Sequence, residues 1–82
     1  GIEAETVQVF RNLSEILKAA GLSFSHVVRV DIFTTDMSSF MQINKIYAKY
    51  FKKDPKPARQ TVEVTKLPKK ARIEVSCIAH LD

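Results

Sequence analysis

Cysteine and histidine are scarce in this sequence. Cys77 is the only cysteine among the 82 residues, and the only histidines are His26 and His80. A single cysteine excludes an internal disulfide, so we expect a protein of a reducing compartment. These three residues do not have the close ligand spacing of a metal site, so we expect no bound metal. Because Cys77 follows the alternation of an apolar strand face, we interpret it as a small core residue rather than a nucleophile.

Long apolar runs are also absent. No segment approaches the roughly 20 apolar residues of a membrane-spanning helix, and no signal-peptide pattern is present. We therefore expect no membrane association and a cytoplasmic protein, with a mitochondrial location as the alternative. The length predicts a single domain over residues 1–82, because a chain of this size buries only about 60–65% of its unfolded surface.

Positive charge exceeds negative charge in the chain. The net charge is +4, and most of the excess lies in residues 45–56 and 66–72. Such a surface permits anionic partners, including RNA. Solvated loops explain the same two clusters, and no RNA-recognition or helix-turn-helix pattern accompanies them. RNA is therefore the second choice of partner.

Two segments have the spacing of amphipathic helices. Residues 3–20 place Val9, Phe10, Leu13, Ile16, Leu17 and Ala20 on one stripe, and Gly21 follows as a stop signal. Asp36, Ser38 or Ser39 can cap a second helix that runs to about Lys52. Its apolar stripe contains Phe40, Ile43, Tyr47, Tyr50 and Phe51, with Ile46 beside it. Both stripes predict helices that pack against a common core.

Three segments, residues 26–35, 59–65 and 72–80, alternate with the period of a strand. In the first, we expect Val28, Val30 and Ile32 to face the helices, and Val27, Arg29, Asp31 and Phe33 to face the opposite side. The order helix, strand, helix, strand, strand predicts an α+β fold, a two-layer sandwich of a mixed sheet with two helices on one face. The strands before and after the second helix should be parallel.

The last two strands each carry one charged residue near the start, Arg59 and Glu74. If both strands lie in one sheet, we expect these two side chains to open onto one concave site. Arginine suits a ligand carboxylate because its planar fork donates two parallel hydrogen bonds and stays charged. Glutamate suits a water molecule or an amine. An exposed arginine and a solvated glutamate are the alternative interpretation.

Several short motifs follow one another in a fixed order along the chain. They are Leu17-Lys18-Ala19-Ala20-Gly21, Val27-Val28-Arg29-Val30, Thr35-Asp36-Met37, the single residues Phe40, Asn44 and Tyr47, and then Pro57-Ala58-Arg59, Leu67-Pro68-Lys69, Ile73-Glu74-Val75 and Cys77-Ile78-Ala79. In this order they resemble the RidA/YjgF/L-PSP family, the small reactive-intermediate deaminases. Family members begin with a further N-terminal portion, including a G-P-Y-S loop and a strand reading like F-V-S-G-Q. Neither occurs in this sequence.

The resemblance implies a fold like that of chorismate mutase of the bacillus type. The strand of residues 72–80 then pairs antiparallel with that of residues 26–35, which lies between it and residues 59–65. The family's N-terminal strands, absent from this sequence, would attach beyond residues 72–80. Family members form homotrimers with sites in the clefts between subunits, so we expect a homotrimer here.

The resemblance also implies an activity, that of a 2-iminobutanoate/2-iminopropanoate deaminase. Such an enzyme hydrolyses reactive 2-imino and enamino acids to 2-keto acids and ammonia, and needs neither a metal nor an organic cofactor. Arg59 is expected to bind the substrate carboxylate, and Glu74 to orient the attacking water. Thr61 is expected to line the pocket, and Asn44 to lie near it. Gln60 and Thr61 stand where many members have smaller residues or, at position 61, a cysteine.

Two other functions remain open. Some relatives carry the labels translation inhibitor and endoribonuclease, so an RNA-binding member is one alternative, although no ribonuclease-like cluster of His, Lys and Glu lies in one stretch. The other alternative is a non-catalytic, ligand-binding member that kept the fold.

Overall fold

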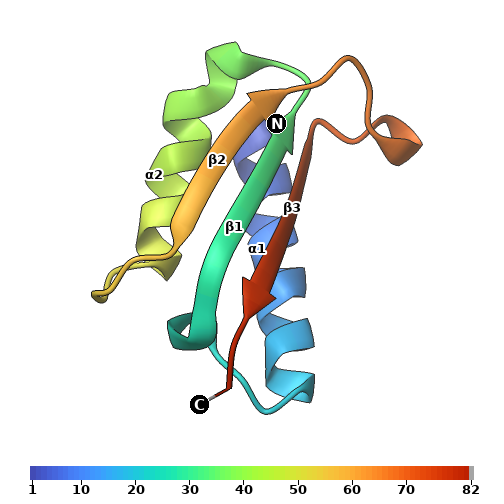
Figure 1. The fold of residues 1–82 in the computed structure, drawn as a ribbon. Helices are drawn as coiled ribbons and strands as arrows, with labels where there is room; N and C mark the ends of the chain where they lie inside the picture. The colour runs from blue at the N-terminus through green and yellow to red at the C-terminus, as the bar shows by residue number, and fades with distance from the viewer. Residues whose placement is uncertain (82) are drawn as a thin grey trace.

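The structure, a computed structural model, describes residues 1–81 and arranges them in two layers (Figure 1). The helices are α1 (Ile2–Ala19) and α2 (Phe40–Tyr50), and the strands are β1 (Val27–Thr34), β2 (Ala58–Glu63) and β3 (Ile73–Ala79). Short 3-10 turns at Phe24–His26, Met37–Ser39 and Pro68–Lys70 precede β1, α2 and β3. Both helices lie behind the same face of the sheet, so the predicted two-layer α+β sandwich is confirmed.

The sheet has the order β2-β1-β3. The central strand β1 pairs in parallel with β2 and antiparallel with β3. This is the strand order that the family resemblance predicted. α2 connects the two parallel strands, β1 and β2. The loop from β2 to β3 lies at the end of the sheet where both of these strands end (Figure 1).

The core lies between the sheet and the helices. Its buried apolar residues are Phe10, Leu17, Val27, Val30, Ile32, Ile43, Ile46, Tyr47, Phe51 and Ile73. Five aromatic rings, those of Phe10, Phe24, Tyr47, Tyr50 and Phe51, contact one another where α1 crosses the C-terminal end of α2. The prediction that Ile16 belongs to the core stripe is wrong. Its side chain is 65% exposed, because the buried line of α1 passes through Phe10 and the adjacent Leu17.

The expected faces of β1 are wrong at its first two residues. Val27 is buried and Val28 is 51% exposed, the reverse of the prediction. The cause is a break in pairing between Val27 and Arg29, where the ladder with β3 shifts by one residue. A bulge of this kind reverses the alternation on one side of it. From Arg29 onward the predicted faces are confirmed, with Val30 and Ile32 buried under the helices.

Local signals account for the helix ends. Gly21 has φ +75, its N–H donates to the Lys18 carbonyl oxygen at 2.9 Å, and the Leu22 N–H donates to that of Leu17 at 2.8 Å. Glycine adopts this left-handed conformation without a steric penalty, so it ends α1 as predicted. The Asp36 side chain accepts from the Ser38 N–H at 3.0 Å and caps the turn that leads into α2.

Candidate active site

Arg59 lies on the edge strand β2, on the face that the helices cover. It pairs with Val30 of β1, a fully buried residue, and cross-strand partners share a face of the sheet. Because β2 is an edge strand, the long side chain of Arg59 is not enclosed by the core and stays exposed. The position therefore lets a cation lie beside α2 while its guanidinium remains open to solvent.

One face of α2 holds the Arg59 side chain. The guanidinium donates from Nη1 to Oδ1 of Asn44. Its Cζ atom lies 4.7 Å from the ring centroid of Tyr47 and 5.6 Å from that of Phe40. Residues at this spacing lie on one side of a helix, so α2 presents one amide and two rings to one guanidinium. Asn44, which the family resemblance places near the pocket, therefore contacts Arg59 directly.

Thr61 lies two residues after Arg59 on the same face of β2. It pairs with Ile32, and its side chain is half-buried. Its Oγ1 atom is buried and has no hydrogen-bond partner among the described residues. A buried hydroxyl without a partner costs about 1–3 kcal/mol. Such an atom is suited to a ligand or a water molecule that arrives at the site.

Glu74 lies on the other side of the sheet. It pairs with Phe33 of β1, whereas Arg59 pairs with Val30, and these two residues point to opposite faces. The two charged residues are also on the two outer strands, with β1 between them. The expectation that both open onto one site is therefore wrong within a single chain. Alternation within a strand predicts which of its residues share a face. Which face of β2 matches which face of β3 depends on how each strand pairs with β1.

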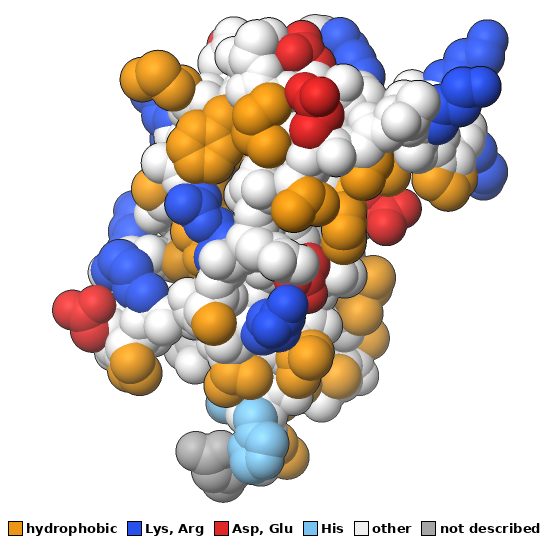
Figure 2. Space-filling model, turned by 45° about the horizontal axis from the view of Figure 1, so that its top comes forward, with side chains coloured by type: hydrophobic (Ala, Val, Ile, Leu, Met, Phe, Trp, Pro, Cys, Tyr) orange, Lys and Arg blue, Asp and Glu red, His pale blue; other side chains and the backbone are white. Residues whose placement is uncertain are grey.

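The helix-free face of the sheet is a mixed surface. Val28 and Ile78 are 51% and 57% exposed there, and Arg29 donates to Asp31 from Nε at 3.1 Å and from Nη2 at 3.0 Å. This pair lowers the pKa of the Asp31 carboxyl group, chiefly through the hydrogen bond. Figure 2 shows apolar side chains spread between charged ones on this side of the molecule. The side chain of Glu74 makes no hydrogen bond or ion pair with any described residue.

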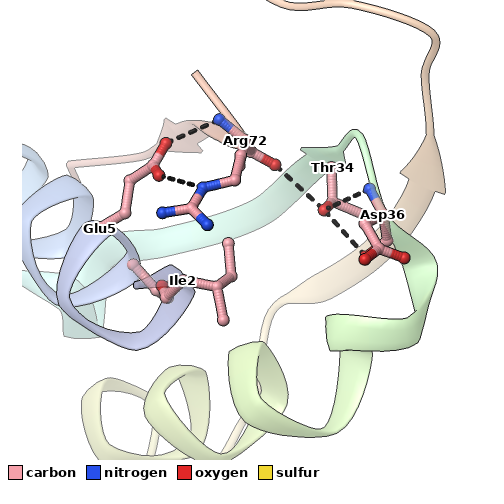
Figure 3. A network of polar contacts seen from close by, with 6 residues as sticks. Ile2, Glu5, Thr34, Asp36 and Arg72 are labelled. Atoms are coloured by element: carbon pink, nitrogen blue, oxygen red, sulfur yellow. Dashed lines mark hydrogen bonds and ion pairs between the residues drawn. The ribbon is translucent and has the colours of Figure 1, made fainter. Parts of the chain in front are cut away.

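A polar network anchors the chain at Arg72, directly before β3 (Figure 3). The Glu5 carboxylate of α1 accepts from the Arg72 N–H at 2.7 Å and from Arg72 Nε at 2.9 Å. The Arg72 carbonyl oxygen accepts from the Thr34 hydroxyl at 3.1 Å, and that hydroxyl accepts from the Asp36 N–H at 3.2 Å. The backbone hydrogen bond from Arg72 holds the pKa of Glu5 below its ordinary value.

Sequence reasoning did not find the link between Glu5 and Arg72. In the sequence, Glu5 has only the signal of an acidic residue in the first turn of a helix, where it complements the helix dipole. The partner lies 67 positions away in the sequence, so no local pattern connects the two residues.

Cys77 faces the helices, as its alternation predicted. It pairs with Val30, its thiol is free, and burial raises its pKa, which disfavours the nucleophilic thiolate. Among residues 1–81, no group of three or more His, Cys, Asp or Glu side chains is arranged to hold a metal ion. In the same part of the chain, neither helix combines the length and the apolar character needed to cross a membrane.

Two surface hollows lie along α2, and Arg59 lines neither of them. One, of about 560 Å³, is lined by Phe40, Met41, Gln42, Asn44 and Lys45, and so includes two of the Arg59 partners. The other, of about 410 Å³, lies where α2 ends, between Phe24, Tyr50, residues 51–55 and Pro57. None of the four predicted site residues lines this second hollow.

The chain is similar to two named enzymes. It is 49% identical over 80 residues to the Arabidopsis thaliana protein named Reactive Intermediate Deaminase A, chloroplastic. It is 42% identical over 79 residues to the human protein named 2-iminobutanoate/2-iminopropanoate deaminase. These matches cover 98% and 96% of this chain but 42% and 57% of the two relatives, so the chain spans about half the length of each.

A solved structure and a family profile agree with these matches. The crystal structure of RidA from the Antarctic bacterium Psychrobacter sp. PAMC 21119 superposes with a TM-score of 0.93 at 36% identity, covering 99% of this chain and 65% of that protein. The profile of the family described as Endoribonuclease L-PSP matches residues 1–81. Together, these similarities confirm the resemblance noted in the sequence: the chain belongs to the Endoribonuclease L-PSP family, which includes the reactive-intermediate deaminases.

Proposed function

We propose that this chain acts in the hydrolysis of reactive 2-imino and enamino acids to 2-keto acids and ammonia. The observation that carries the proposal is the setting of Arg59, an exposed guanidinium held by the side chains of α2. The printed names of the Arabidopsis and human relatives support the reaction class. The preferred substrates in this proposal are 2-iminobutanoate and 2-iminopropanoate.

Arg59 binds the carboxylate of the imino acid. The guanidinium has five N–H donors, and the hydrogen bond to Asn44 occupies one nitrogen. The remaining edge can donate two parallel hydrogen bonds to a carboxylate, a geometry that a lysine ammonium cannot reproduce. With the carboxylate fixed, the adjacent imine carbon is held in one place, which lowers the entropic cost of the attack.

Thr61 lines the same side of the strand, next to Arg59. Its buried, unpartnered hydroxyl is supplied with a hydrogen bond when the substrate or a bound water arrives. Asn44 acts on the substrate through Arg59, because its oxygen accepts from the guanidinium.

Glu74 completes the site from a neighbouring copy of the chain. Its carboxylate lies on the face away from Arg59, and that face exposes the apolar side chains of Val28 and Ile78. A second copy that covers this face brings one chain's Glu74 toward another chain's Arg59. We propose a homotrimer, because a closed ring of this kind gives every subunit the same pair of contacts.

The chemistry balances with water as the only co-reactant. Glu74 orients a water molecule whose oxygen forms a bond to the imine carbon, while the imine nitrogen gains a proton. The hydroxyl proton then passes to the nitrogen as the carbonyl forms, the carbon–nitrogen bond breaks, and ammonia leaves. No cofactor takes part, since a protonated imine is already electrophilic. The single cysteine of the chain suits a reducing compartment, and we propose the cytoplasm, with mitochondria as the alternative.

The direct test is the release of ammonia from a freshly made imino acid. A threonine dehydratase generates 2-iminobutanoate in the cuvette, and the purified chain is added in its assembled form. We expect the appearance of ammonia and 2-ketobutanoate to accelerate in proportion to the added chain. An assembled, folded chain that leaves the spontaneous rate unchanged would rule out the proposed reaction.

RNA binding is the second candidate, because the surface around the end of α2 is basic. Lys49, Lys52 and Lys53 line the hollow there and form no ion pair with a described residue. Binding through phosphates would weaken steeply as salt is raised. A filter-binding titration of single-stranded RNA at several salt concentrations distinguishes this candidate from the deaminase, since the imino-acid reaction requires no polyanion.

A further inference from the structure

The ring of Tyr47 connects the aromatic core to the candidate site. It is only 8% exposed, and it stacks on Phe51 at a centroid distance of 4.6 Å and an interplanar angle of 25°. Phe10 approaches it nearly edge-on, at 6.3 Å and 70°. Contacts with rings from α1 and from the end of α2 therefore hold its orientation, and the same ring lies 4.7 Å from the Arg59 guanidinium carbon.

A single hydrogen bond does not orient a guanidinium. The contact with Asn44 fixes the position of one nitrogen, but the plane of the group can still turn about that contact. A neighbouring aromatic ring restricts this rotation, because arginine stacks on ring faces and is attracted by their negative potential. Phe40 gives a second ring contact, at 5.6 Å, but its side chain is less buried than that of Tyr47.

The hydroxyl of Tyr47 has no visible part in this arrangement. It donates no hydrogen bond to a described residue. Burial raises the pKa of Tyr47, an effect that the positive charge of Arg59 partly opposes, so the side chain is neutral near pH 7. The contribution of Tyr47 to the site is therefore that of a ring.

We propose that Tyr47 is a positioning residue whose ring sets the plane of the Arg59 guanidinium, and so the direction in which Arg59 meets the substrate carboxylate. The inference rests on the proposed role of Arg59. It adds that a core aromatic residue with no contact to the substrate determines how well the substrate binds. Tyr47 acts through Arg59, and its hydroxyl is dispensable.

Variants at Tyr47 separate the ring from the hydroxyl. Tyr47→Phe keeps the ring and should leave KM for the imino acid within about twofold of wild type, whereas Tyr47→Leu should raise KM about five- to tenfold. The matched control is Tyr50→Leu, which removes an aromatic ring from the same core; the ring contacts of Tyr50 are with Phe10 and Phe24 rather than with Tyr47 or Arg59. It should destabilise the fold and leave KM unchanged. An unchanged KM in Tyr47→Leu, or an equal rise in Tyr50→Leu, would overturn the proposal.

A second variant avoids a loss of folding. Replacing Tyr47 by pentafluorophenylalanine keeps the shape of the ring but removes the negative potential of its face. This variant should raise KM in the same direction as Tyr47→Leu while its unfolding midpoint stays near that of Tyr47→Phe. A KM equal to that of Tyr47→Phe would contradict an electrostatic contact between the ring and the guanidinium.

Side-chain NMR tests the positioning without any enzyme assay. The 15N relaxation of the Arg59 Nε–Hε group should report a restricted guanidinium in wild type, Tyr47→Phe and Tyr50→Leu, and a mobile one in Tyr47→Leu. If wild type releases no ammonia yet shows this pattern, the positioning stands and the proposed reaction fails. If Arg59 is equally restricted in all four proteins, the positioning role is wrong whatever the activity.

Discussion

The two faces of the sheet differ in whether their proposed site residues have side-chain partners within one chain. On the helix side, Arg59 already contacts Asn44, Phe40 and Tyr47, and Thr61 lies beside it. On the other side, Glu74 contacts no charged or polar partner among the described residues. The carboxylate-binding half of the proposed site is thus built within a chain. In the proposed assembly, the water-orienting half comes from a second copy, so assembly and activity should be coupled.

Removing the guanidinium from the completed side should have the largest effect. Arg59→Ala should abolish measurable imino-acid hydrolysis, because the lost charge-assisted contact alone is worth on the order of 1.5–3 kcal/mol, or about 10- to 150-fold in binding. Arg59→Lys should also be poor, since a point charge does not form the two parallel bonds. Kinetics and thermal unfolding check both, with stability nearly unchanged because the side chain is exposed.

The exposed residue Arg11 provides the matched control. Arg11→Ala removes the same charge from the surface of α1 and should keep full activity. Full activity in Arg59→Ala would end the assignment of Arg59 to the substrate carboxylate.

A charge placed on the open face should separate the subunits. Phe33 lies on that face, paired with Val62 on one side and Glu74 on the other. Phe33→Asp puts a carboxylate where a second copy must pack, and buried charge without a partner is strongly unfavourable. Light scattering on a size-exclusion column should show a monomer, and hydrolysis should be lost with it.

Ile16 offers a control of the same kind on α1. Ile16→Asp changes a 65% exposed side chain on the surface of this helix and should leave both mass and activity unchanged. A wild-type chain that is itself a monomer with full activity would contradict the coupling between assembly and catalysis.

Loss of Glu74 should slow the chemical step more than it weakens binding. We expect Glu74→Ala to lower kcat about a hundredfold, the lower end for a positioned acid or base, with a much smaller change in KM. Glu74→Gln keeps the shape and should be nearly as slow. A Glu74→Ala protein that unfolds more easily, yet has normal kcat per folded molecule, would make Glu74 a structural residue.

The contact between Glu5 and Arg72 should give the smallest effect, on stability at neutral pH. The pKa of Glu5 is lowered below its ordinary 4.5, chiefly by the Arg72 N–H. A lowered folded-state pKa means that the stabilisation is complete above about pH 4.5 and is lost as the pH falls through the lower value. Glu5→Gln should therefore cost about 1 kcal/mol near pH 7, and the difference from wild type should shrink in acid.

Glu3 provides the control for that measurement. Glu3→Gln removes the same charge from the first turn of α1 without touching Arg72. Denaturant unfolding of both variants between neutral and acidic pH should show a pH-dependent loss for Glu5→Gln only. Equal losses in the two variants would mean that the helix dipole, rather than Arg72, explains the role of Glu5.

Periodicity predicted the two layers, and the family resemblance predicted the strand order and a place for Asn44 near the pocket. These features follow from local periodicity, which encodes which residues share a face, and from the family resemblance. Patterns failed where faces depend on pairing between strands. The bulge after Val27 exchanged the expected buried and exposed positions of Val27 and Val28. The separate pairing of β2 and β3 with β1 put Arg59 and Glu74 on opposite faces. The bond between Glu5 and Arg72 joins distant parts of the chain and leaves no local signal.

Mixing two inactive variants tests the central claim most directly. Arg59→Ala and Glu74→Ala subunits are unfolded together in equal amounts, refolded and assayed. If each site takes Arg59 from one chain and Glu74 from the next, about a quarter of the sites in randomly mixed rings contain both residues, and activity should return to about that fraction. Mixing Arg59→Ala with the double variant should restore none. Mixed assemblies that stay as inactive as the separate variants would contradict a site shared between chains.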